Sequence, residues 1–129
     1  MSNEFRELSG LRVNVDKVVL MPHLDAPQDR PYPYVYFLTI INDSHESVII
    51  ESRKWILRDL DGDVLVVEGH GVVGENPHLK PGESFSYHSY HVIKTDTEAR
   101  GSLFGRTESS QKLRVSVPPF KMIIAPELS

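Results

Sequence analysis

The chain has 129 residues, no cysteine, and eighteen Asp and Glu against fourteen Lys and Arg, which gives a net charge of −4 at pH 7. This length suits one domain, and an acidic balance without a long basic run argues against nucleic acid and anionic membrane as partners. The lack of cysteine excludes disulfides, thiolate metal ligands and a cysteine nucleophile, and it agrees with a reducing compartment, so we expect a cytoplasmic protein.

The first part of the chain reads as a short tail followed by a strand. Residues 1–10 lack the apolar segment of a secretory signal and are expected to precede a single domain at residues 11–129. From Leu11 onward apolar and polar residues alternate, as in a strand with one buried face, and Lys17 breaks this phase, which indicates a bulge or a strand end. Residues 21–33 are rich in proline and charge, which predicts a long, variable loop.

Turn signals separate the next strands. Residues 34–41 are apolar or aromatic on both faces, which predicts a central strand. Residues 53–60 form another extended stretch, and we expect its Trp55 in the core between two sheets. The Asp-Gly pair at residues 61–62 predicts a hairpin, and the Lys-Pro-Gly-Glu sequence at residues 80–83 fits a type II turn.

The last third of the chain continues the pattern with two interruptions. Phe85 starts a strand that is expected to bend near His88, because Tyr90 falls in the opposite phase. Residues 95–100 read as a polar linker. The pair Pro118-Pro119 is expected to end the final strand. About eight short strands without an amphipathic helix predict an all-β fold, an antiparallel β-sandwich of the immunoglobulin or fibronectin type III kind.

A glycine-rich stretch at residues 69–74 matches the G-x-G-x-x-G pattern of dinucleotide-binding folds. That pattern must open a helix, but Pro77 and Pro81 follow closely, so the glycines are expected on a connection between strands. Two interpretations stay open: a tight backbone turn, and a nest of N–H groups that binds phosphate or pyrophosphate. Arg53 and Lys54 lie on opposite faces, so only one of them can face such a ligand. The candidate anion-binding residues are Gly69, His70, Gly71, Val72, Val73, Gly74 and Arg53.

Several stretches together resemble the ApaG domain family, namely residues 52–56, 67–75, 81–85 and 101–105. The similarity covers nearly the whole chain from Leu11, and the glycine stretch followed by the Pro-Gly turn is its specific part. The resemblance implies an immunoglobulin-like or fibronectin type III sandwich without an established catalytic activity or cofactor. It also implies an association with cobalt resistance and magnesium efflux. Related domains in F-box proteins and in a polymerase-delta-interacting protein suggest binding of other proteins. The loop at residues 21–33 and the tail at residues 121–129 depart from the family pattern.

Other chemical patterns are weaker. Six histidines lack the His-x-His spacing of a chelating strand, so no metal site is expected. The Asp-rich residues 59–63 lack the spacing of a calcium loop, and no G-x-S-x-G sequence supports a hydrolase. Tyr32, between Pro31 and Pro33, has little core to enter in a proline-rich loop. These three residues are therefore the candidate contact with a protein partner.

We therefore expect a non-enzymatic module that binds another protein, whose identity the sequence does not give. A homodimer is an open alternative, whereas nucleic acid and membrane are not expected partners. The main rival function is binding of a phosphate-bearing or metal-associated small ligand at residues 69–74.

Overall fold

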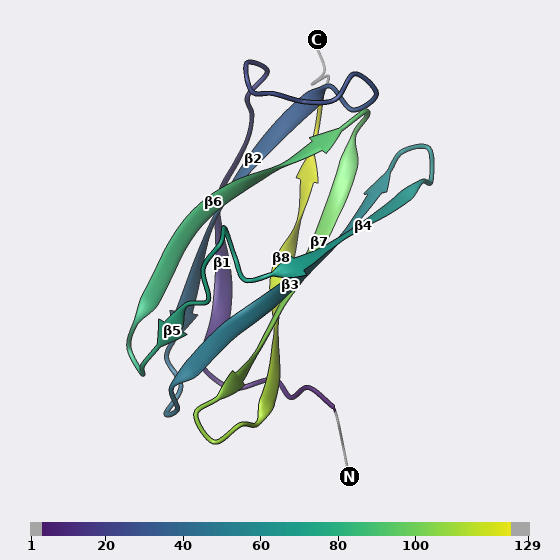
Figure 1. Cartoon of the computed structure of the whole chain (residues 1–129). Helices are drawn as coiled ribbons and strands as arrows, with labels where there is room; N and C mark the ends of the chain where they lie inside the picture. The colour runs from purple at the N-terminus through teal and green to yellow at the C-terminus, as the bar shows by residue number, and fades with distance from the viewer. Residues whose placement is uncertain (1–3, 125–129) are drawn as a thin grey trace.

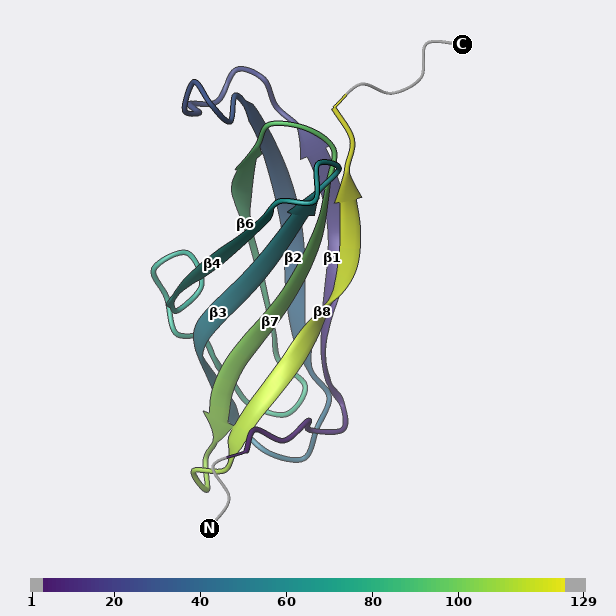
Figure 2. The same ribbon diagram turned by 90° about the vertical axis from the view of Figure 1, so that its right-hand side faces the viewer.

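The computed structural model describes residues 4–124 as an all-β sandwich of eight strands in two antiparallel sheets that face each other (Figures 1 and 2). The strands are β1 (Leu11–Leu20), β2 (Tyr32–Asn42), β3 (Val48–Asp59), β4 (Val64–His70), β5 (His78–Leu79), β6 (Ser84–Ile93), β7 (Thr97–Thr107) and β8 (Lys112–Met122). The sandwich architecture confirms the fold that the alternating pattern predicts. Residues 4–124 contain no helix, and so no helical segment with the length and apolarity that a membrane crossing requires.

Each sheet has a simple strand order. The first sheet runs β1-β2-β6, and β2 lies in its middle, as its two apolar faces predict. The second sheet runs β4-β3-β7-β8, and the short β5 pairs with the first residues of β3. Because β7 occupies the other side of β3, β4 and β5 lie along the same side of it. The glycine-rich stretch is the excursion of the chain between these two strands.

Trp55 lies at the centre of the core between the two sheets. Its side chain is 1% exposed, and its ring centroid lies 4.9 Å from that of Tyr36, 4.8 Å from that of His91 and 5.7 Å from that of Phe120. These neighbours come from β2, β6 and β8, so one side chain of β3 contacts both sheets. The structure confirms the predicted core position of Trp55.

The predicted bulge and turns are also confirmed. The register between β1 and β2 shifts between Val15 and Lys17. Gly62 has φ = +88° in the hairpin that joins β3 to β4. In the turn before β6, the N–H of Glu83 donates to the carbonyl of Lys80 at 2.9 Å, and Gly82 has φ = +89°. In the hairpin, the N–H of Gly62 donates to the carbonyl of Asp59 at 3.0 Å, so Gly62 supplies the positive angle that ends a three-residue hairpin loop. Gly82 supplies the positive angle that a type II turn requires.

The prediction that Pro118 and Pro119 end the last strand is wrong, because β8 continues to Met122. β8 is an edge strand, where proline can occupy positions whose nitrogen faces away from the sheet. The register also shifts opposite the two prolines, between Ala99 and Gly101 of β7. This bulge accommodates the residues that cannot donate to the ladder.

The predicted polar linker at residues 95–100 is also wrong, because β7 begins at Thr97. Thr97 and Ala99 are buried on the inner face, whereas Glu98 and Arg100 form an ion pair of 3.1 Å on the outer face. The alternation is present, but small and polar inward residues hide it in the sequence.

The predicted bend of β6 near His88 does not occur. β6 pairs with β2 without a register shift, and Tyr90 lies outside, 42% exposed, with its hydroxyl donating to the carbonyl of Asp25 at 3.1 Å. His91 takes the inward position instead and is 6% exposed. The inward residues of β6 are Phe85, Tyr87, Ser89, His91 and Ile93.

Candidate functional site

The long side of β4 that faces away from β3 has no strand beside it within residues 4–124 (Figures 1 and 2). On its outer face Val64 is 48% exposed and Val66 is 47% exposed. On its inner face Leu65 and Val67 pack against the core but remain half-buried. β4 therefore combines an unpaired backbone edge with apolar side chains on both faces, the combination that favours strand addition.

The edge strands β1, β6 and β8 expose fewer large apolar side chains. β1 is interrupted by its bulge, and β6 presents Ser86 to solvent on its outer face. β8 contains Pro118 and Pro119, and the N–H of Arg6 donates to the carbonyl of Lys112 along part of its free side at 3.0 Å. Bulges, prolines and covering segments each discourage the pairing of another chain with a sheet edge. Of the described edge strands, β4 exposes the most large apolar side chains.

Two further exposed apolar side chains lie at the two ends of β4. Leu60, in the hairpin that precedes β4, is 74% exposed, and Val73, in the excursion that follows it, is 53% exposed. They lie in the two connections that flank β4, and the exposed Glu68 and His70 stand between Val66 and Val73 in the chain. Exposed apolar side chains that gather around one element mark an interaction surface more strongly than scattered ones do.

The glycine-rich excursion is a tight turn held by its own backbone. The N–H of Gly71 donates to the carbonyl of Glu51 at 2.6 Å, and Val72 and Glu75 exchange backbone hydrogen bonds of 2.8 and 3.0 Å. Between them Val73 and Gly74 have φ = 47° and 79°, both positive as in a type I′ turn. The turn inserts the fully buried Val72 into the core and leaves Val73 in a conformation that β-branched residues rarely adopt.

Arg53 of β3 crosses over Gly69 of β4 to reach this excursion. Its Nη1 donates to the carbonyls of His70 and Gly71 at 2.9 and 3.0 Å. A Cβ added to Gly69 would lie 2.6 Å from the Nη2 of Arg53, so only glycine leaves room for the guanidinium. Lys54 is exposed on the opposite face, as predicted.

The structure thus brings the candidate anion-binding residues and Arg53 together. The excursion presents two carbonyls to the guanidinium, and the amides of Gly71, Val72 and Glu75 donate to backbone carbonyls. This geometry gives the glycine at position 71 a backbone role, because a Cβ there would lie 2.5 Å from the carbonyl oxygen of Glu75. Anion binding at the excursion stays a prediction.

Next to Arg53, the inner face of β6 carries buried polar atoms. The hydroxyl of Tyr87 and the Nε2 of His91 have no hydrogen-bond partner within residues 4–124. Burial raises the pKa of Tyr87; proximity to Tyr36 adds to this effect, and the positive charge of Arg53 opposes it. Burial lowers the pKa of His91 to about 4, so this histidine is neutral at pH 7.

Tyr32 is not placed as the sequence predicts. It is the first residue of β2 rather than part of the loop, and it packs half-buried against the core. Pro33 is fully buried, whereas Pro31 is exposed. The premise that Tyr32 has no core to enter is therefore wrong, because the strand begins earlier than the prolines suggest. The role of these three residues in a protein contact stays a prediction.

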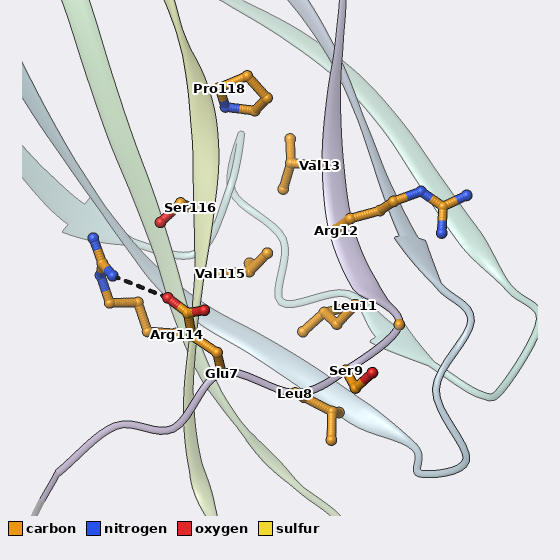
Figure 3. A pocket seen from close by; sticks show the side chains of 11 residues that line it. Glu7, Leu8, Ser9, Leu11, Arg12, Val13, Arg114, Val115, Ser116 and Pro118 are labelled. Atoms are coloured by element: carbon orange, nitrogen blue, oxygen red, sulfur yellow. Dashed lines mark ion pairs between the residues drawn. The ribbon is translucent and has the colours of Figure 1, made fainter.

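A pocket of about 580 Å³ lies between β1, β8 and the segment before β1 (Figure 3). Its two arginines already have carboxylate partners, Arg12 with Asp43 at 2.8 Å and Arg114 with Glu7 at 3.6 Å. The pocket therefore offers little net charge to a ligand. Within residues 4–124, no group of three or more histidine, aspartate or glutamate side chains is placed to hold a metal ion.

The exposed edge of β4 was not among the sequence-predicted sites. The signal was the apolar run at residues 64–67, which has no charged residue on either face. Such a run is also typical of a central strand, so the sequence does not indicate whether a neighbouring strand covers it.

Comparison with known proteins identifies the family. The family model described as ApaG domain matches residues 22–108. The chain belongs to the ApaG domain family. Protein ApaG of Rhodopseudomonas palustris strain TIE-1 is 37% identical over 106 residues, which cover 79% of each chain. Protein ApaG of a Shewanella species, strain MR-7, is 30% identical over 116 residues, which cover 89% of this chain and 91% of the relative.

Solved structures agree with the ApaG assignment. The crystal structure of a Bordetella pertussis protein named ApaA matches with a TM-score of 0.79 and 29% identity over 94% of this chain and 98% of that one. A late embryogenesis abundant protein matches with a TM-score of 0.61 and 12% identity, over 89% of this chain and 72% of that one. At that identity the likeness concerns the fold alone.

Proposed function

We propose that this ApaG-domain chain is a non-enzymatic, cytoplasmic binding module that takes up an extended segment of another protein along the free edge of β4. The observation that carries the proposal is the unpaired edge of β4, with Val64 and Val66 nearly half exposed beside it. An extended segment that pairs with an exposed edge gains backbone hydrogen bonds, while side chains on alternate positions supply specificity.

The chemistry of β4 suits this mode of binding. An added strand would cover Val66 on the outer face and the half-buried Leu65 and Val67 on the inner face. Burial of this apolar surface adds to the backbone pairing, and the preformed strand needs little rearrangement. The metal-related phenotype that the family resemblance implies would then act through the bound protein.

Co-purification of tagged variants from the native cell tests the proposal. Val66→Lys places a charge on the outer face of β4, a substitution that blocks strand addition in natural edge strands. Ser116→Lys adds the same charge to the outer face of the protected edge strand β8 and is the matched control. We expect one recurrent protein to accompany the wild type and the Ser116 variant but not the Val66 variant, as measured by mass spectrometry.

Unfolding curves of both variants check that each is folded. A recurrent partner that stays with the Val66 variant would place the contact elsewhere on the chain and would overturn the proposal.

A further inference from the structure

We propose that the segment taken up beside β4 carries an Asp or Glu side chain opposite Gly69, where its carboxylate pairs with the guanidinium of Arg53. This inference rests on the proposed function and states the chemistry of the partner segment.

Arg53 and Gly69 are opposite each other in the pairing of β3 with β4. The Cζ and both Nη atoms of Arg53 lie 2.6 to 2.7 Å from the position that a Cβ of Gly69 would occupy, so the guanidinium covers β4 rather than β3. Neighbouring strands are about 4.8 Å apart. A residue opposite Gly69 in an added strand would therefore lie next to the guanidinium, with no side chain between them.

The guanidinium has donors left for such a residue. Only its Nη1 donates within residues 4–124, to the carbonyls of His70 and Gly71. Nε and Nη2 donate to no described residue, and Arg53 forms no ion pair with the carboxylates of residues 4–124. A half-buried guanidinium with two free nitrogens matches a carboxylate, which accepts two parallel hydrogen bonds.

A second donor lies on the facing sheet. The hydroxyl of Tyr87 on the inner face of β6 is buried without a partner, and it is close enough to Arg53 for the two groups to interact electrostatically. Burial of this hydroxyl without a partner is costly. Arg53 supplies the donors that the inference requires, and Tyr87 adds an unpaired polar atom on the facing sheet.

The side chains along β4 define the rest of the segment. Side chains of an added strand alternate between the two faces, so the residue opposite Val67 shares the inner face with the acidic residue. The residue opposite Val66 lies on the outer face beside an exposed apolar side chain. An antiparallel partner segment would thus carry its acidic residue first, and apolar residues two, three and four positions later.

A second copy of this chain does not fit the site. In a two-fold antiparallel pairing of β4 with β4, the inner faces stay on the same side, so an inward residue lies opposite Gly69. The inward residues of β4 are Leu65, Val67 and Gly69, whereas Glu68 is on the outer face. Self-pairing therefore supplies no carboxylate to Arg53, and the partner is a different protein.

Two capped peptides test the inference: acetyl-Lys-Thr-Glu-Thr-Val-Val-Val-Thr-Lys-amide and the same peptide with Gln in place of Glu. Each is titrated into the ¹⁵N-labelled full chain and followed by NMR. We expect shifts of the β4 amides and of the Arg53 Nε signal, and an affinity about tenfold higher for the Glu peptide, since the paired guanidinium favours the charged acceptor. Arg53→Gln should abolish this difference, and Lys54→Gln, which removes a charge from the outer face of the same strand, should preserve it.

Arg53→Lys is the second variant, because it keeps the charge and the fold while it loses the forked donor, and it should reduce the difference severalfold. Equal affinity of both peptides for the wild type, with both lost in Val66→Lys, would overturn the acidic assignment and leave strand uptake in place. A tenfold preference that persists in both Arg53 variants would also overturn it. Failure of the Glu peptide to bind up to millimolar concentration would overturn the inference, while the co-purification result would still decide the proposed function independently.

Discussion

On one side of the sandwich the edge strands β1 and β8 pack against each other, and their inward side chains, such as Val13 and Val117, are buried. On the other side β4 and β6 make no comparable contact, and the inward Val67 and Phe85 remain half-buried (Figure 2). The same alternation of apolar residues therefore gives a closed side and an open side.

The difference shows where this fold keeps apolar surface available. Prolines and the segment around Arg6 protect the β8 edge, whereas at the β4 edge an arginine of β3 lies over a glycine of β4. Edge strands are usually protected because they promote association. An edge that lacks such protection, and that has a cationic group behind it, suits selective association with one kind of segment.

The largest effect is expected where the two sides meet, at Trp55. Trp55→Ala should lower the free energy of unfolding by roughly 3–5 kcal/mol, because the ring contacts both sheets and its removal leaves a cavity. Urea denaturation measures the loss. The outward neighbour provides the control, and Lys54→Ala should change stability by no more than about 0.5 kcal/mol. Equal losses in the two variants would contradict a core that spans both sides.

Acid should lower the free energy of unfolding through His91. This residue lies on the inner face of β6 and contacts the rings of Tyr36 and Trp55. Its pKa in the folded chain is about 4, below the value of about 6.5 in the unfolded chain, so the unfolded state binds the proton first. Stability should therefore fall as the pH drops from 6.5 toward 4, by roughly 2–3 kcal/mol between pH 7 and pH 4.5.

The variant His91→Phe keeps the ring contacts and removes the titration, so its stability should depend less on pH over this interval. His88→Gln, on the exposed outer face of β6, should retain the wild-type dependence. Urea midpoints at the two pH values provide the measurement. The same acid loss in His91→Phe as in the wild type would assign the effect to other groups.

A matched pair of truncations compares the closed and open sides directly. Val117→Ala in β8 should cost about 2 kcal/mol, because the side chain is 2% exposed and its loss leaves a cavity. Val67→Ala in β4 should cost about 1 kcal/mol, because its half-buried side chain has less apolar surface to lose. Denaturation curves of both variants test the comparison, and a larger loss at Val67 would reverse it.

The smallest expected effect concerns the contact between Arg53 and Gly69. Gly69→Ala should destabilise the chain by about 1 kcal/mol, because the new methyl group displaces the guanidinium from the carbonyls of His70 and Gly71. In an Arg53→Gln background the same substitution should have little effect. The double-mutant cycle measures this coupling, and additive losses would show that the two residues act independently.

Local patterns in the sequence predicted a large part of this fold. The bulge at Lys17, the hairpin after Asp59, the turn before β6 and the buried Trp55 are all confirmed, because each depends on a few neighbouring residues. The predicted inward position of Tyr90 in β6 was wrong, because Tyr90 lies outside although it is more apolar than its inward neighbour His91. The unbroken alternation of β6 places His91 inward, where it stacks on Tyr36.

The sequence by itself determined the all-β class, most strand positions and the family, because period-two alternation and turn residues act over short distances. The tertiary structure alone decided that β4 has an unpaired edge and that Pro118 and Pro119 lie within the edge strand β8. It also decided that Arg53 crosses Gly69, a contact between residues sixteen positions apart in the chain. The physical reason is that alternation determines which side chains of a strand face the core. The strands that pair with it depend instead on contacts between segments far apart in the chain.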